Sequence, residues 1–200
     1  MSVMTSSRTV LPDDRPLTVE DLDLLPDDGN RYELDDGVLV VSPAPAINHQ
    51  LVLARLTVLL EEARPAEFLV LPGPGVEMSK FQYRIPDLAV VHIDAIDIDG
   101  KSVTNPPVLA IEIASPSTAI YDRNRKKEVY AGFGIASYWI VTPSLDKPRL
   151  VALELRRGSY REAAEVSGDE VFVAVRPFAV EIVPSALVAG PWQNRRNALR

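Results

Sequence analysis

The sequence predicts an α/β fold in which a central mixed β-sheet is flanked by helices. Seven stretches of alternating or β-branched residues follow one another along the chain, and two longer segments show helical periodicity instead. A length of 200 residues, without an internal repeat or long linker, fits one domain of ordinary size. The seven predicted strands cover 68–71, 83–93, 108–114, 138–141, 150–156, 160–166 and 171–173.

The N-terminal region predicts a loose arm, a short helix and a β-hairpin, in that order. Residues 1–16 are polar and carry two prolines, which is typical of a flexible arm. Thr18 followed by Asp21 indicates a capping box, and Pro26 ends the short helix. Asp35-Asp36-Gly37 separates two apolar stretches, 32–34 and 38–41, and is a typical hairpin turn.

Helices are predicted over 47–64 and 119–133. The first carries two apolar arcs on nearly opposite sides, and a helix of this kind usually packs between two layers. We therefore expect both arcs to be buried. One arc consists of Val52, Leu53, Leu56, Leu59, Leu60 and Ala63, and the other of Ile47, Leu51, Ala54 and Val58.

The composition excludes several classes of protein. With 46% hydrophobic and 24% charged residues and no apolar run long enough to cross a membrane, the chain predicts a globular, cytoplasmic protein. There is no cysteine, which excludes disulfides, thiolate nucleophiles and cysteine zinc sites, and two histidines cannot form a three-histidine metal site. A net charge of −7 counts against broad electrostatic binding of nucleic acid. This net charge does not exclude a nuclease whose basic residues are concentrated near its active site.

Two carboxylates interrupt apolar strands in the same way. Asp87 shares its side of the predicted strand with Ala89, and Glu112 shares its side with Ala110 and Ala114. Burying a carboxylate is costly unless it is paired or binds a cation, and small neighbours leave room beside it. The pattern indicates two walls of one polar cleft that holds a metal ion. Two buried ion pairs, or an edge position that reaches water, are the alternatives.

A lysine on the second predicted helix belongs beside these carboxylates. Asp122, Lys126, Val129, Tyr130 and Phe133 form one stripe, and its apolar members indicate that it faces the sheet. Lys126 is therefore either a salt-bridge partner of the carboxylates or a catalytic cation. The basic residues off this stripe are expected to point outward, outside the cleft, where they would contact nucleic-acid phosphates. They are Arg123, Arg125 and Lys127.

Six motifs in a fixed order resemble a known family over about residues 17–187. Together they are similar to the second group of the Uma family, restriction-endonuclease-like proteins of the PD-(D/E)XK nuclease superfamily. The motifs are Arg31-Tyr-Glu-Leu-Asp-Asp-Gly-Val-Leu, Ser42-Pro-Ala-Pro with His49, Ile85-Pro-Asp-Leu-Ala-Val-Val, Glu112-Ile-Ala-Ser-Pro-Ser-Thr, Asp122 with Lys126 and Tyr130, and Gly134-Ile-Ala-Ser-Tyr-Trp-Ile-Val. The resemblance implies a restriction-endonuclease-like core over 17–187, followed by a tail over 188–200.

The resemblance also implies roles for individual residues. Asp87 and Glu112 would bind a divalent ion, Mg²⁺ or Mn²⁺, with the main-chain carbonyl of Ile113 as a further ligand. The superfamily expects a lysine two residues after the acidic residue, but Ala114 stands there. The resemblance implies that the lysine has moved to the next helix, which is where the helical stripe places Lys126.

Three further residues are possible accessory groups. Glu33 would approach the site by resemblance, although a structural role through Arg31 or the hairpin is an equal alternative. Asp122 lies on the sheet-facing stripe with Lys126. His49, in the first turn of the long helix, is more typical of a core or helix-cap histidine than of a catalytic one.

The sequence thus predicts a metal-dependent endonuclease with DNA as its substrate and Asp87, Glu112 and Lys126 as its catalytic residues. A homodimer is expected, because cutting both strands of a duplex usually requires two active sites. The alternative is a non-catalytic nucleic-acid-binding or assembly module that retains the nuclease fold.

Overall fold

The computed structural model describes residues 11–114 and 120–191, and for 120–123 it describes the backbone alone. Its centre is a six-stranded sheet with the order β10-β9-β8-β7-β6-β3. Strands β7 and β8 run parallel, and the other neighbours are antiparallel. The strands are β3 (Phe68–Pro72), β6 (Leu88–His92), β7 (Leu109–Ile113), β8 (Ser137–Thr142), β9 (Arg149–Arg156) and β10 (Ser159–Ser167).

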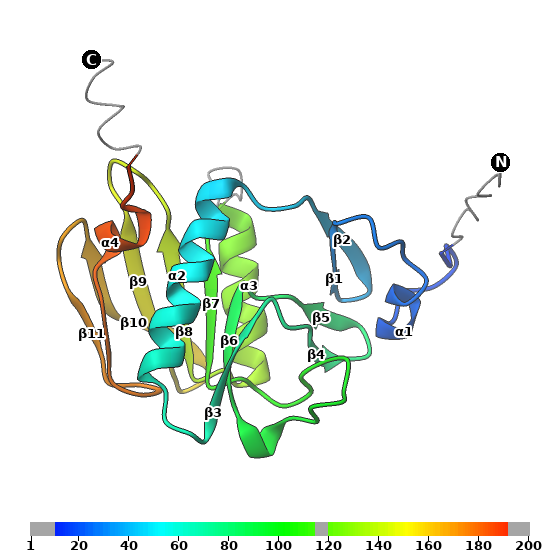
Figure 1. Cartoon of the computed structure of the whole chain (residues 1–200). Coiled ribbons are helices and arrows are strands. Elements are labelled where there is room, and N and C mark those ends of the chain that lie inside the picture. The colour runs from blue at the N-terminus through cyan, green and yellow to red at the C-terminus, as the bar shows by residue number, and fades with distance from the viewer. Residues whose placement is uncertain (1–10, 115–119, 192–200) are drawn as a thin grey trace.

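Helices cover both faces of this sheet, so the predicted fold class is confirmed (Figure 1). Helix α2 (Ile47–Ala63) packs on one face together with α4 (Pro184–Val188) and the small sheet of β11 (Phe172–Ala174) and β12 (Val180–Ile182). Helix α3 (Ile120–Phe133) packs on the other face, where Tyr130 lies against Ala110 and Tyr138. Among the described residues no helix is long and apolar enough to span a membrane.

A second, four-stranded sheet with the order β2-β1-β5-β4 stands beside the main one (Figure 1). The predicted hairpin is confirmed as strands β1 and β2 of this sheet. The predicted capping box is confirmed at the short helix that precedes them. Asp36 and Gly37 have φ values of 51° and 80°, and a Cβ on Gly37 would lie 2.5 Å from Pro16, so the turn requires glycine there. The elements are α1 (Val19–Leu22), β1 (Arg31–Asp35), β2 (Val38–Ser42), β4 (Val76–Ser79) and β5 (Gln82–Arg84), and a 3₁₀ turn, η1 (Ile93–Ala95), follows β6.

The strand predicted over 83–93 is in fact two strands in two different sheets. Strand β5 ends at Arg84 and β6 begins at Leu88. Pro86 explains the break, because it has no N–H to donate and restricts the residue before it. Asp87 therefore lies directly before β6 and not within a continuous strand. Strands β4 and β12, of four and three residues, were not predicted.

The prediction that both apolar arcs of α2 are buried was wrong. Val52, Leu56 and Leu60 are buried, but Ile47 is 86% exposed and Val58 54% exposed. The sheet covers one side of the helix, and no described element packs over the other. Exposed valines around β11 continue this surface, which we call the outer apolar face. It comprises Ile47, Ala54, Val58, Val171, Val173 and Val175.

The two sides of α2 predict opposite responses to the same truncation. We expect Leu56→Ala to lower the free energy of unfolding by about 2–5 kcal/mol, because it leaves a cavity in the core. Val58→Ala, two residues later and therefore on the opposite, exposed side of the helix, should change it by less than about 0.5 kcal/mol. Urea unfolding followed by circular dichroism measures both, and equal losses would contradict the assignment of the buried side.

Candidate active site

Asp87 is held at the junction of the two sheets by three groups. Ala89 pairs with Ala110 across β6 and β7, and the same register brings Asp87 opposite Glu112. The Asp87 side chain is 3% exposed, its Oδ1 accepts a hydrogen bond from Arg31 Nη1, and its Oδ2 accepts one of 2.7 Å from the Ile113 amide. His49 Nε2 lies 3.0 Å from the same Oδ2. Burial alone would raise the pKa of Asp87, but His49, Arg31 and the amide hold it below its ordinary value.

Glu112 lies on β7, on the face of the sheet that α3 covers. Its Oε2 accepts a 2.9 Å hydrogen bond from Lys126 Nζ, and its Oε1 accepts one of 2.6 Å from the Tyr130 hydroxyl. Burial raises the pKa of Glu112 to about 7, in spite of Lys126 and with help from the nearby carboxylates of Asp87 and Glu33. The ionised form of Glu112 is therefore unfavourable here without additional positive charge beside it.

One cleft of about 410 Å³ brings the predicted residues together. The alternating pattern of the two strands and the stripe on α3 therefore converge on the same space. The residues that line this cleft include Asp87, Glu112, Lys126, Ile113, Ala114, Glu33, His49 and Arg31.

The two accessory residues on this wall have clear contacts. Glu33 lines the cleft and also has a structural role, since its Oε1 accepts a 2.7 Å hydrogen bond from the Ile85 amide and its Oε2 lies 3.6 Å from Arg84 Nη1. His49 is buried in the first turn of α2. The helix-cap alternative for His49 was wrong, because Ala46 is the N-cap residue of α2.

The predicted cationic group is divided by the structure. Arg125 was expected to point outward, outside the cleft; it lies outside the residues that line the cleft, but its guanidinium donates to both Asp35 and Asp36 in the β1–β2 turn. Lys127 is half-buried and lies outside the residues that line the cleft. The side chains of Asp122 and Arg123 lie outside the part of the chain that the structure describes.

Sequence reasoning missed Arg31 and Tyr130 as site residues. Arg31, Glu33 and Asp35 alternate along β1, and this period of two places all three on one face. A polar face on a hairpin strand was therefore the signal for Arg31. Tyr130 was assigned to the apolar core, and its ring is indeed buried; its hydroxyl, however, reaches Glu112.

The donor set suits a hard divalent cation such as Mg²⁺. Mg²⁺ takes oxygen ligands, uses one or two carboxylates and keeps several waters. Among the described residues no three His, Asp or Glu side chains are arranged as a preassembled metal centre. Two neighbouring carboxylates, Asp87 and Glu112, nevertheless line one cleft and match the two-carboxylate mode of binding.

A mixed sheet with helices on both faces and a hairpin sheet at one end defines a restriction-endonuclease-like fold. The family model Uma2, described as putative restriction endonuclease, matches residues 19–185, and the chain belongs to this family. The fold is also that of a crystal structure of a putative nuclease belonging to DUF820 from Anabaena variabilis ATCC 29413. That likeness has a TM-score of 0.69 at 17% sequence identity and covers 86% of this chain and 98% of the other. Comparison with curated proteins finds no match.

Proposed function

We propose that the protein is a metal-dependent endonuclease that hydrolyses DNA phosphodiester bonds. The observation that carries the proposal is the single cleft in which Asp87 and Glu112 lie side by side with Lys126 Nζ 2.9 Å from Glu112. Membership of the Uma2 family supports a nuclease. A cytoplasmic location stays a prediction.

We infer the following roles for the residues of the cleft. Asp87 and Glu112, with the Ile113 carbonyl, would hold Mg²⁺ or Mn²⁺, which when bound polarises the phosphate and acidifies water. Lys126 orients the attacking water and stabilises the negative charge that develops on the phosphate. Tyr130 fixes the second oxygen of Glu112, while Arg31 and His49 fix Asp87.

Calorimetric titration with Mn²⁺ and a cleavage assay test the proposal together. We expect the wild type to bind Mn²⁺ and to cut DNA in its presence. Asp87→Asn should lose both properties, and Asp13→Asn, an exposed aspartate far from the cleft, should keep both. Mn²⁺ binding without cleavage of duplex, single-stranded or supercoiled DNA would favour the alternative, a non-catalytic nucleic-acid-binding or assembly module.

Three basic residues of α3, Arg123, Arg125 and Lys127, are proposed as phosphate contacts. We expect Arg123→Ala with Lys127→Ala to weaken DNA binding and to flatten its dependence on salt. With fewer phosphate contacts, fewer counterions are released from the DNA when the protein binds. Adding Arg125→Ala should lower stability as well, since Arg125 also anchors the β1–β2 turn. Fluorescence anisotropy at several salt concentrations measures the slope. An unchanged slope in the triple variant would refute the assignment.

The outer apolar face supports a homodimer. A groove of about 550 Å³ between α2 and β12 is lined mainly by apolar side chains, with Arg55 and Glu181 at its margin. A twofold axis placed midway between Arg55 and Glu181 would set Arg55 of each copy against Glu181 of the other. We expect a dimer in analytical ultracentrifugation and a folded monomer for Val58→Arg. A monomeric wild type would exclude this dimer.

A further inference from the structure

A second cavity lies beside the candidate active site, separated from it by a shared wall. Its volume is about 580 Å³, within the range of small-molecule sites. Arg31 and Ile85 line both spaces. The Gly73 amide, on the wall of the second cavity, donates a 2.9 Å hydrogen bond to the backbone carbonyl of Asp87. A nucleotide next to one bound in the active-site cleft would therefore reach this cavity.

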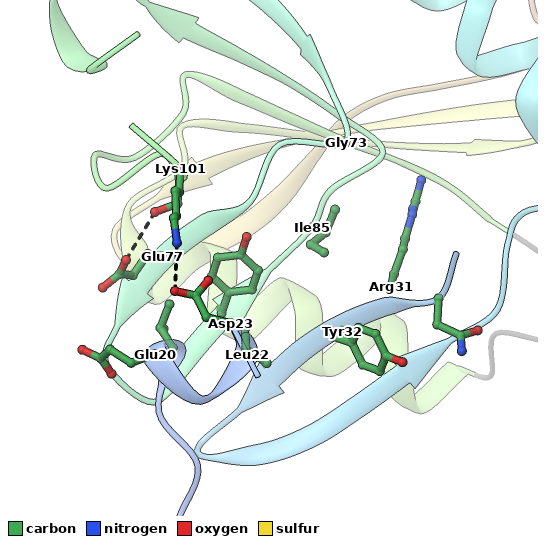
Figure 2. Close-up of a pocket in the computed structure, with 13 residues that line it drawn as sticks. Glu20, Leu22, Asp23, Arg31, Tyr32, Gly73, Glu77, Ile85 and Lys101 are labelled. Carbon is green, nitrogen blue, oxygen red and sulfur yellow. Dashed lines mark hydrogen bonds and ion pairs between the residues drawn. The ribbon is translucent and has the colours of Figure 1, made fainter. Parts of the chain in front are cut away.

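The charges in this cavity are separated into two ends (Figure 2). Glu20, Asp23 and Glu77 gather at one end, and Arg31 stands at the other. Lys101 neutralises one carboxylate of the acidic end through a 2.9 Å ion pair with Asp23. The acidic end keeps a net negative charge, so it repels phosphate and favours groups that donate hydrogen bonds.

The space between the two ends has apolar and aromatic walls. Leu22, Ile85, Tyr32 and Tyr83 supply them. The Tyr83 ring occupies the place where a Cβ on Gly75 would be, since that atom would lie 1.8 Å from the Tyr83 hydroxyl. Burial, followed by the charges of Glu77 and Asp23, raises the pKa of Tyr83, which agrees with its position beside the acidic end. Tyrosine rings and aliphatic side chains of this kind are surfaces on which nucleobases stack.

We propose that this cavity binds an unpaired nucleobase with an exocyclic amine, adjacent to the scissile phosphate. The proposal rests on the proposed function, because the nucleotide would direct its phosphate toward Arg31 and the active-site cleft. Arg31 gives one N–H to Asp87, and a guanidinium has five. The base edge would then meet the carboxylate of Glu77, which accepts a hydrogen bond from an amine such as cytosine N4 and repels the carbonyl oxygen of thymine.

The substrate class follows from this arrangement. A base that is paired in a duplex uses its amine for its partner, so the cavity selects single-stranded or locally unpaired DNA. Among unpaired bases it prefers those with an amine over thymine. Glu77 is the specificity residue, since it lines the cavity and its Oε2 accepts a 3.3 Å hydrogen bond from Ser102, which lines the same cavity.

Single strands of 5-methyl-deoxycytidine and of thymidine are the matched probes, because the two bases have the same shape. They differ in the amine that replaces the carbonyl at C4 and in N3, which carries a hydrogen in thymine and none in 5-methylcytosine. Fluorescence anisotropy with Ca²⁺ in place of Mg²⁺ should show the 5-methylcytosine strand binding about tenfold more tightly to the wild type. Glu77→Gln should abolish most of this preference. Glu165→Gln, the same change on β10 far from the cavity, should keep it.

Equal affinities in the wild type, or an undiminished preference in Glu77→Gln, would overturn the proposal. Thermal unfolding of each variant verifies that it is folded. Cleavage of the same strands with Mg²⁺ separates the two proposals. Preference without cleavage of these strands or of duplex or supercoiled DNA would support the base site and refute the nuclease. Cleavage without preference would do the reverse.

Discussion

Lys126→Met is expected to lower the single-turnover rate of DNA cleavage by at least about 100-fold, which corresponds to about 3 kcal/mol of transition-state stabilisation. Lys126 reaches Glu112 from α3, while the usual lysine position is occupied by Ala114. Methionine keeps the apolar stem of the side chain and removes its charge, so the fold should survive. DNA affinity should change little, because the lost interaction acts mainly in the transition state.

A second change distinguishes a displaced catalytic lysine from a simple counter-ion. Ala114 lines the same cleft, so Lys126→Met combined with Ala114→Lys should recover part of the activity. Lys147→Met, the same change at an exposed lysine outside the residues that line the cleft, is the matched control and should stay active. Full activity of Lys126→Met would end the catalytic assignment.

Glu112→Gln should have opposite effects on activity and on stability. Cleavage and Mn²⁺ binding should be lost with the carboxylate. The metal-free variant, however, should be more stable than the wild type at pH 8, by up to about 3 kcal/mol. The physical reason is that burial raises the pKa of Glu112 to about 7, so the ionised form is unfavourable in the folded state.

The difference in stability between the variant and the wild type should depend on pH. Below the ordinary pKa of 4.5 the carboxyl is protonated in both the folded and the unfolded states, and the variant and the wild type should be equally stable. From there to about pH 7 only the unfolded state loses its proton, so the wild type loses stability relative to the variant. Urea unfolding at pH 4.5, 6 and 8 measures the difference. A variant that is less stable at pH 8 would show that Lys126 and Tyr130 stabilise the carboxylate more than burial destabilises it.

Patterns of period two and 3.6 predicted the parts of the site that lie on regular elements. Alternation placed Glu112 on the alanine-lined face of β7, and the helical stripe placed Lys126 toward the same face. Both could be predicted because each depends on a local repeat. His49 and Arg31 could not be assigned in this way, because their contacts with Asp87 join segments 38 and 56 residues apart and depend on how α2 and the hairpin pack.

The errors also have physical causes. Apolar side chains on two sides of α2 predicted two covering layers, but a hydrophobic pattern cannot show whether the second layer belongs to the same chain. Arg125 was expected to face solvent because it lies off the apolar stripe. Its partners, Asp35 and Asp36, come from a turn 90 residues earlier, and no helical wheel contains them.

The ion pairs between the β1–β2 turn and Arg125 have a practical consequence for protein engineering. Surface hairpin turns are commonly chosen for inserted tags, because most tolerate extra residues. This turn is different, since Asp35 and Asp36 hold the residue directly before Lys126, and Asp35 also contacts Arg84 beneath it. A tag or loop inserted here would disturb the position of Lys126 although the insertion site is on the surface. The segment around the 3₁₀ turn that follows β6, which shares none of these contacts, is the better attachment point.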